Sequence, residues 1–290
     1  MKVRGRTEEE MIKMVLGMAR RDERIRVVGL NGSRVNPNAP RDWFQDFDFA
    51  FIVTEMTGFI NDERWLEVFG PRIILQKPEA MSLFPPSLGN WFSFLMLLED
   101  GNRIDLMLIP LSELDQYLAA DKLTVILLDK DGLVETLPEP SDETHWVKKP
   151  SEQLVDDCCN EFWWLAPYVA KGLARRELIY AIDHLYLMRG QLLTMISWRV
   201  GLETDFSVSV GKNHKYLDRY IPAEEFAALS ATYQNGSPEA VDQALRSSLT
   251  LFRSASRSVI SRMGSVYPDY DEKVSDYLEC FIFGDYPATH

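Results

Sequence analysis

Two aspartates separated by one residue, Asp46 and Asp48, stand in a run of aromatic and aliphatic residues that ends at Val53. Such a run predicts a β-strand, and residues i and i+2 of a strand point to the same face. The two carboxylates therefore leave one side together, while Phe47 and Phe49 line the other. Adjacent negative charges repel unless a cation lies between them, so the pair predicts a divalent metal held by Asp46 and Asp48.

A glycine-serine turn lies upstream of this pair. Gly32 and Ser33 follow a short apolar run, residues 25–30, that predicts a buried strand. Glycine lets backbone amides approach a ligand closely, and a serine hydroxyl can bind a phosphate oxygen. Gly-Ser alone is typical of an ordinary turn, and Asp-x-Asp alone is typical of a solvated strand face. The two together favour a site for a metal and a phosphate.

A third acid, Asp105, lies in a later apolar run. Residues 91–98 and 103–109 are apolar and are separated by Asp100 and Gly101, a pairing that indicates a β-hairpin. A carboxylate between Ile104 and Leu106 is expensive to bury without a partner. We therefore predict that Asp105 joins Asp46 and Asp48 as the third catalytic and metal-binding carboxylate.

The elements that position these residues predict an α/β domain in the first half of the chain. Residues 7–21 read as an amphipathic helix with a capping box made by Thr7 and Glu10. Residues 61–69 and 111–120 predict further helices, the second capped by Ser112. Residues 46–53 and 72–76 predict further strands, and residues 125–128 predict one more strand or the end of a helix. The α/β domain is assigned to residues 1–137.

The second half of the chain predicts an all-α domain. A proline-rich acidic segment, residues 138–150, is interpreted as the linker. Beyond it the apolar residues follow helical spacing, and residues 151–290 are assigned to a helical domain. The expected helices, separated by glycine or proline, span residues 152–171, 177–200, 222–233, 238–262 and 271–283.

Composition limits the classes of function. The chain has 290 residues, 46% of them hydrophobic and 26% charged, which is enough to bury a core. A net charge of −13 argues against nucleic acid as a partner, because a phosphate-backbone binder needs a basic surface. An acidic cleft would instead concentrate a metal ion or a polycationic small substrate. A negative surface that only keeps the protein soluble is the alternative.

The location of the protein is also constrained. No apolar run approaches the roughly 20 residues that a membrane span requires, and the first six residues lack the apolar core of a signal peptide. We therefore expect a cytoplasmic protein without a membrane partner. The cysteines, Cys158, Cys159 and Cys280, are odd in number, which predicts reduced and partly buried thiols.

The residues described so far resemble the nucleotidyltransferase superfamily typified by DNA polymerase beta. Its pattern is Gly-Ser, a spacer, Asp-hydrophobic-Asp, and a third carboxylate on a later strand. The chain resembles more closely the aminoglycoside 6-adenylyltransferases that inactivate streptomycin. The strings that carry this resemblance cover nearly the whole chain, at residues 32–34, 43–46, 89–93, 108–110, 157–163, 171–175, 181–185 and 267–270.

This resemblance implies a mixed-sheet nucleotidyltransferase domain followed by a helical domain, with ATP and the drug bound between them. It also implies Mg²⁺-dependent transfer of AMP from ATP to a streptomycin hydroxyl, with release of pyrophosphate. Asp46 and Asp48 would hold the metal ions, because acidic residues that hold Mg²⁺ across phosphates supply positioning and charge neutralisation. Asp105 would share a metal or take the proton of the attacking hydroxyl.

The triphosphate of ATP also needs cations. It would be bound by Gly32, Ser33 and Arg34 and by a cation of the helical half, for which Lys171, Arg175 and Lys212 are the candidates. A solvated surface charge is the alternative for each cation.

The drug carries guanidinium groups, which bind carboxylates and aromatic faces. Glu161, Trp164 and Asp183 are therefore the expected drug-binding residues. Trp163 could also offer an aromatic face, and core packing is the alternative for Trp163 and Trp164 alike, because adjacent helical residues cannot both face one site.

Two other functions remain open at this point. The chain could transfer a nucleotide to another hydroxylated small molecule, because the sequence specifies the transfer chemistry better than the acceptor. It could also be a nucleotide-binding module without catalysis, although three spaced acids argue against a degenerate site. The oligomeric state is not predicted.

Overall fold

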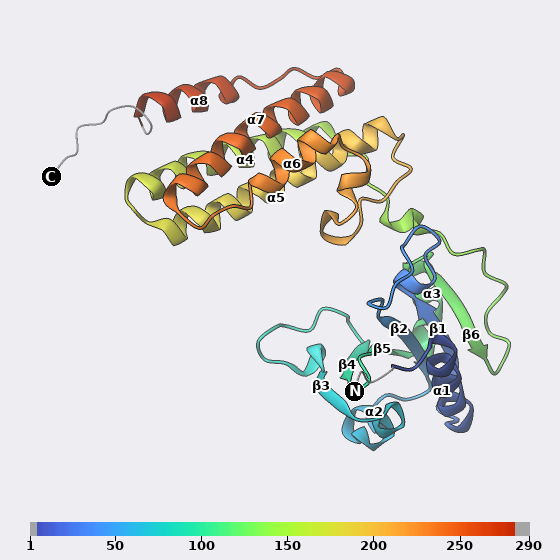
Figure 1. Cartoon of the computed structure of the whole chain (residues 1–290). Coiled ribbons are helices and arrows are strands. Elements are labelled where there is room, and N and C mark those ends of the chain that lie inside the picture. The colour runs from blue at the N-terminus through green and yellow to red at the C-terminus, as the bar shows by residue number, and fades with distance from the viewer. Residues whose placement is uncertain (1–4, 282–290) are drawn as a thin grey trace. The chain divides into compact units, whose positions relative to one another are not determined.

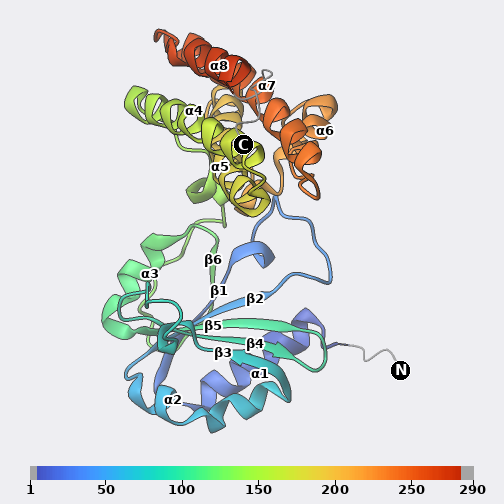
Figure 2. The same cartoon turned by 90° about the vertical axis from the view of Figure 1, so that its left-hand side faces the viewer.

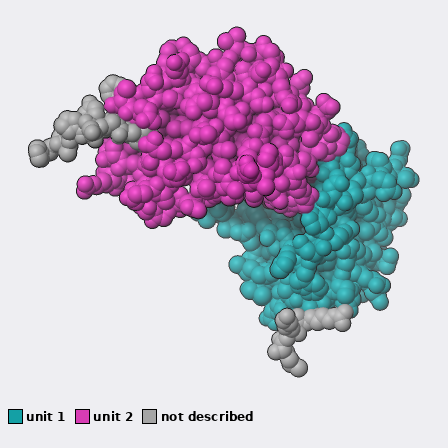
Figure 3. Space-filling model, turned by 45° about the horizontal axis from the view of Figure 1, so that its top comes forward, with its two compact units in different colours: residues 1–144 teal, residues 145–290 magenta. Residues whose placement is uncertain are grey.

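The computed structural model describes residues 5–281, and the chain divides into two compact units, Met1–Thr144 and His145–His290 (Figure 3). The first unit is built on a mixed sheet with helices, and the second is helical (Figure 1). The predicted fold class, α/β followed by all-α, is confirmed. The division between the units falls inside the segment expected as a linker, residues 138–150.

Six strands form the sheet of the first unit, in the order β3-β4-β5-β2-β1-β6 (Figure 2). The central strands β2 and β5 run parallel, and every other neighbouring pair is antiparallel. The turn between β4 and β5 is the predicted hairpin. The strands are β1 (Ile25–Asn31), β2 (Phe47–Val53), β3 (Arg72–Gln76), β4 (Phe92–Leu98), β5 (Arg103–Pro110) and β6 (Thr124–Asp129).

The two faces of this sheet are covered differently. Helix α1 (Glu8–Arg21), with the predicted capping box, packs on the face that receives Phe47, Phe49 and Phe51. Helix α3 (Leu114–Ala120) packs on the opposite face, where Ala50 and Ile52 are buried in a smaller cluster. Because side chains alternate along β2, Asp48 belongs to the face of Ala50 and α3. The larger core cluster thus lies on the α1 face, and on the opposite face the side chains of Asp48 and Asp105 stay half-buried.

Two helix predictions in this unit are wrong in detail. Residues 61–69 were expected to be one helix, but α2 (Thr57–Asn61) ends before Asp62, which is extended at φ −128°. A 3-10 helix, Glu63–Phe69, follows, and the Asp62 side chain accepts a hydrogen bond from the Arg64 amide. Ser112 does not cap α3, because it lies in the preceding 3-10 turn and the N-cap residue is Glu113.

The segment expected as a linker is partly packed. A 3-10 turn, Asp142–His145, lies within it, and Asp142 is buried. The Thr144 hydroxyl donates to the Asp121 carboxylate at 2.7 Å, and the Ser141 amide donates to the Lys122 carbonyl at 3.3 Å. These bonds attach residues 141–144 to the loop between α3 and β6, so this stretch belongs to the first unit.

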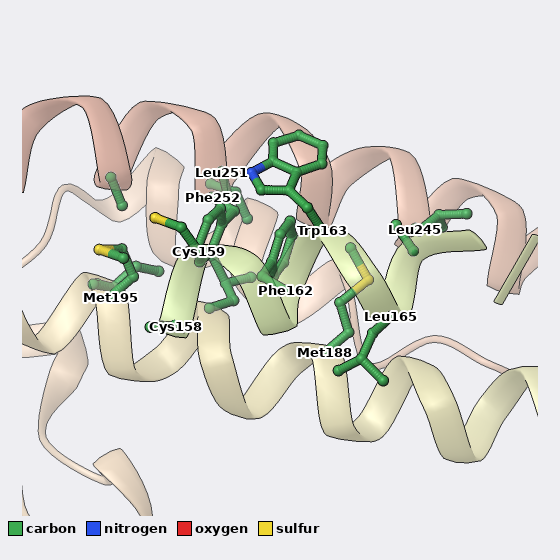
Figure 4. Close-up of a cluster of buried hydrophobic side chains, with 14 of the residues drawn as sticks. Cys158, Cys159, Phe162, Trp163, Leu165, Met188, Met195, Leu245, Leu251 and Phe252 are labelled. Atoms are coloured by element: carbon green, nitrogen blue, oxygen red, sulfur yellow. The ribbon is translucent and has the colours of Figure 1, made fainter. Parts of the chain in front are cut away.

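The second unit consists of helices that pack around an aromatic core (Figure 4). Phe162 stacks on Phe252 with ring centroids 3.6 Å apart, and Trp163 is buried beside them, so of the two adjacent tryptophans it is Trp163 that packs in the core. The last two residues of the expected helix 271–283 lie outside the described residues. The helices are α4 (Glu152–Ala174), α5 (Leu178–Glu203), α6 (Ala223–Ala231), α7 (Pro238–Met263) and α8 (Tyr270–Phe281).

The three cysteines have the predicted character. Cys158 and Cys159 are buried in the helical core and Cys280 is exposed, and all three are free thiols (Figure 4). Burial raises the pKa of the Cys159 thiol to about 12, which keeps it protonated and unreactive. Within residues 5–281, none of the helices combines the length and the apolar character that a membrane crossing needs.

Candidate active site

The strand register brings the predicted carboxylates to one end of the central strands. Asp48 of β2 pairs with Asp105 of β5 on one side and with Asn31 of β1 on the other. Paired residues on neighbouring strands share a face of the sheet, and neighbouring strands lie about 4.8 Å apart. Asp46 precedes β2 rather than lying within it, two residues before Asp48. The structure thus places the three acids together, half-buried at the open face.

Gly32 lies directly against the Asp48 carboxylate. A Cβ on Gly32 would be 2.4 Å from Asp48 Oδ2, closer than atoms can approach, and the glycine has φ +72°. Both conditions favour glycine, because other residues rarely adopt a positive φ and bring a side chain. The Gly32 amide donates to the Leu123 carbonyl at 3.1 Å, which holds the turn in place. The contact with Asp48 and the positive φ therefore explain why a glycine stands at position 32.

A buried tyrosine, Tyr117, holds the side chain of Asn31, the β1 residue that is paired with Asp48. The Tyr117 hydroxyl donates to Asn31 Oδ1 at 2.9 Å, and Asn31 Nδ2 donates to Thr124 Oγ1 at 2.7 Å. Burial raises the pKa of Tyr117 to about 12, so the phenol stays protonated and keeps donating. Sequence reasoning missed Tyr117, because a tyrosine in a short helix carries no signal until the register is known.

Arg34 holds the chain immediately before β2. Its guanidinium donates to the Asp46 carbonyl at 2.9 Å, the Gln45 carbonyl at 2.6 Å and the Glu8 carboxylate at 2.9 Å. It also lies over the Phe47 ring, 3.5 Å from the centroid, and is 9% exposed. These hydrogen bonds use three of the five N–H donors of Arg34, and they fix the backbone at Gln45 and Asp46. Binding of the triphosphate by Arg34 stays a prediction.

Arg103 is the cation that contacts the carboxylates. Its Nε and Nη2 each donate to one oxygen of Asp105 at 2.8 Å, and Nε lies 3.7 Å from Asp46 Oδ2. The hydrogen bonds that Arg103 donates to Asp105, partly opposed by burial, raise the pKa of Arg103, and the charges of Asp105, Asp46 and Asp48 add to this. Sequence reasoning missed Arg103. The signal was present, because residues 103 and 105 are two apart on a strand and share a face.

The donor set suits a hard divalent cation. Carboxylate oxygens are the ligands that Mg²⁺ prefers, and here they come from paired positions on parallel strands. Within residues 5–281, no three His, Cys, Asp or Glu side chains are grouped in an arrangement that could hold a metal. Asp105 accepts both hydrogen bonds of the Arg103 fork. By chemical type, the carboxylates of Asp46, Asp48 and Asp105 fit a divalent metal.

The expected drug-binding residues lie on the surface of two neighbouring helices of the second unit. Glu161 and Trp164 are exposed on α4, and Asp183 is exposed on α5. Trp164 is 63% exposed and begins a row of rings, with Tyr168 at 6.3 Å and His184 5.0 Å from Tyr168. The structure therefore places an exposed aromatic ring and two carboxylates on the α4 and α5 surface.

The two expected lysines occupy different parts of the second unit. Lys171 is half-buried near the end of α4, with Nζ 5.8 Å from the Tyr277 ring of α8. Lys212 is exposed and begins a 3-10 turn after Gly211. Both next residues, Asn213 and His214, have positive φ, at 54° and 62°. This constrained loop exposes Lys212 better than Lys171, whose stem packs on α8.

Comparison with known proteins covers nearly the full chain. The family model described as streptomycin adenylyltransferase matches residues 5–281. The chain belongs to this family. The suspected relationship is confirmed, and with it the assignment of the protein as an enzyme of the nucleotidyltransferase class.

Individual relatives agree with the streptomycin adenylyltransferase family. The chain is 46% identical to an aminoglycoside 6-adenylyltransferase of Bacillus subtilis (strain 168), over 94% of this chain and 97% of that protein. It is 46% identical to one from Campylobacter jejuni, over 94% and 95%, and 40% identical to one from Staphylococcus aureus, over 94% and 98%. A crystal structure of an aminoglycoside 6-adenyltransferase from Bacillus subtilis is similar at 42% identity, covering 94% and 98%, with a TM-score of 0.47.

Proposed function

We propose that this protein transfers AMP from ATP to the 6-hydroxyl of streptomycin, releases pyrophosphate and so confers resistance to the drug. The observation that carries the proposal is the register of Asp48 against Asp105 beside the Gly32 turn. The family and the names of the relatives, which are 40 to 46% identical to this chain, support the choice of an aminoglycoside as acceptor.

Asp46, Asp48 and Asp105 are the residues that would hold Mg²⁺. When bound, Mg²⁺ neutralises charge across the phosphates. Asp46 is held in place by Arg34 through its backbone carbonyl, and Asp48 by its close packing on Gly32. Asp105 either shares the metal or accepts the proton of the attacking hydroxyl. Its carboxylate is 24% exposed, so an acceptor can reach it.

The transfer itself requires few groups of the protein. The acceptor hydroxyl oxygen bonds to the α-phosphorus of ATP, the bond from that phosphorus to the bridging oxygen breaks, and pyrophosphate leaves. The Gly32 turn and the Ser33 hydroxyl are suited to orient the triphosphate, because small residues allow close approach. Lys171 and Lys212 are the candidate cations for the phosphates.

Streptomycin would be recognised by the helical unit. Its guanidinium groups match the exposed carboxylates of Glu161 and Asp183 and the exposed ring of Trp164. A cation over a tryptophan face is worth about 0.5–1 kcal/mol at an exposed site. These three residues therefore set the choice of acceptor, and the first unit sets the chemistry.

A pyrophosphate-release screen over a panel of aminoglycosides with ATP and Mg²⁺ tests the proposal. Release that depends on streptomycin and is absent in Asp48→Asn is the expected result. Pyrophosphate release with another hydroxylated compound, and none with streptomycin, would show that the acceptor is wrong and that the nucleotide transfer is right. A thermal shift with ATP and Mg²⁺, without release for any acceptor, would instead identify a non-catalytic nucleotide-binding module.

A further inference from the structure

Arg103 occupies the place between carboxylates where a cation is needed. Its guanidinium forks onto both oxygens of Asp105 and lies within ion-pair distance of Asp46. The side chain of Arg103 is 45% exposed and that of Asp105 is 24% exposed. One protein cation thus binds two of the three acids that the proposed function assigns to a metal.

We propose that Arg103 is a resident counter-ion of the carboxylate site, which a divalent metal displaces when it binds. The proposal rests on the proposed function, because it concerns the same three acids. It adds a positioning role for a residue that holds the site together in the metal-free protein. Arg103 therefore sets the affinity for the metal rather than binding the metal itself.

Exposure makes this exchange feasible. A half-exposed ion pair changes an equilibrium constant by only about fivefold, because water and salt screen it. A divalent ion held by Asp46, Asp48 and Asp105 would offer twice the charge of the guanidinium. The fork is therefore strong enough to occupy the Asp105 carboxylate without metal and weak enough to be replaced.

Because Arg103 lies at the start of β5, its displaced side chain could bind phosphate oxygens. Residue 103 shares a face with Asp105, so the freed guanidinium stays beside the metal. Anionic phosphates that arrive with the metal would be adjacent to it, and arginine binds phosphate oxygens through the same fork. Displacement by the metal would thus make a phosphate-binding cation available at the moment it is needed.

The test measures Mn²⁺ affinity by titration calorimetry on the full-length protein without nucleotide. Arg103→Gln removes the competing charge and should bind Mn²⁺ up to about fivefold more tightly than the unmodified protein. Arg103→Lys keeps the charge but loses the fork, and its affinity should fall between the two. Arg26→Gln is the matched control. Arg26 lies near the start of β1, at the opposite end of that strand from Asn31, and it pairs with Asp131 and Glu23. The control should leave the affinity unchanged.

The outcomes separate this inference from the proposed function. Loss of Mn²⁺ binding in Asp48→Asn with tighter binding in Arg103→Gln supports both. If Asp48→Asn loses binding but Arg103→Gln binds equally or more weakly, Arg103 is a structural clip and the displacement is wrong, while the metal site stands. Mn²⁺ binding that does not depend on Asp48 in any variant overturns the metal site and the counter-ion role together.

Discussion

The two units of the molecule each contain an arginine forked onto an aspartate, and the two pairs differ in burial. Arg103 and Asp105 are 45% and 24% exposed, whereas Arg253 and Asp271 of the second unit are 31% and 5% exposed. Asp271 also accepts hydrogen bonds from the Tyr267 hydroxyl at 3.0 Å and from Ser275. The same chemical pair is exchangeable where it meets solvent and structural where it is enclosed.

The enclosed pair gives a physical reason for one of the strings that suggested the family. Residues 267–270 place Tyr267 between Ser256 and Asp271, and place the Tyr270 hydroxyl 3.0 Å from the Asp156 carboxylate. These bonds fasten α8 to α7 and α4. The string therefore serves the stability of the helical unit, while the Gly-Ser and Asp-x-Asp strings form the proposed site of the first unit.

The largest expected effect separates chemistry from stability. Asp48→Asn keeps the shape of the side chain and removes its charge, so turnover should fall by about 10³-fold or more, because charge neutralisation across phosphates is most of the catalysis. The free energy of unfolding should change by less than about 1 kcal/mol, since the residue is partly exposed. Initial rates of pyrophosphate release and urea unfolding measure the two quantities. Near-normal turnover would remove Asp48 from the site.

Asp271→Asn should do the reverse in the second unit. The half-buried Arg253 guanidinium loses its buried charge partner, and the free energy of unfolding should fall by about 2–3 kcal/mol, somewhat below the range for a fully buried pair. Urea unfolding followed by helical circular dichroism measures it. Asp242→Asn is the control, because Asp242 forms an exposed i,i+4 pair with Arg246 on the same helix, α7, and should cost about 0.3–0.5 kcal/mol. Equal losses in both variants would show that burial does not distinguish these pairs.

Gly32→Ala tests whether the steric fit on Asp48 matters beyond backbone conformation. The new Cβ would collide with Asp48 Oδ2 in addition to the strain at φ +72°. Turnover should drop about 10–100-fold as the carboxylate moves, and stability should drop by about 2 kcal/mol. Gly132→Ala is matched in conformation, with φ +65° and no atom within 4 Å of a Cβ. It should cost about 1 kcal/mol and leave turnover intact. Equal turnover in the two variants would assign the role of Gly32 to its backbone alone.

The parts of the site that the sequence predicts are those with a local pattern. Alternation along 46–53 and 103–109 gives the strands, and alternation also puts Asp48 and Asp105 on definite faces. The role of Arg34 depends on Glu8, 26 residues away, and on carbonyls that become neighbours only in the folded chain. No local pattern reports such partners. The Ser112 cap is wrong because the 3-10 turn Leu111–Glu113 moves the N-cap to Glu113, whose carboxylate accepts hydrogen bonds from Asn90 and Trp91 of a distant loop.

The smallest expected effect concerns a buried tyrosine in each unit, since burial raises the pKa of both Tyr117 and Tyr267 to about 12. A phenol whose pKa is higher in the folded state contributes stability below its unfolded pKa of about 10 and loses it as the pH rises toward 12. Tyr117→Phe should lower the free energy of unfolding by about 1 kcal/mol at pH 8, because the side-chain amide oxygen of Asn31 loses its hydrogen-bond donor. At pH 11 the difference from the unmodified protein should shrink by about 1 kcal/mol, because the variant has no phenol to ionise in the unfolded chain.

Urea unfolding at pH 8 and pH 11 measures this difference for Tyr117→Phe, and Tyr186→Phe serves as the control because Tyr186 is 69% exposed. The control should leave the pH dependence of the unfolding free energy as it is in the unmodified protein. A Tyr117→Phe deficit that stays constant from pH 8 to pH 11 would mean that the phenol meets water in the folded state. The hydrogen bond from Tyr117 to Asn31 would then be open to solvent, as the Arg103–Asp105 pair is. Polar interactions closed off from water, such as Arg253 with Asp271, would be confined to the helical unit.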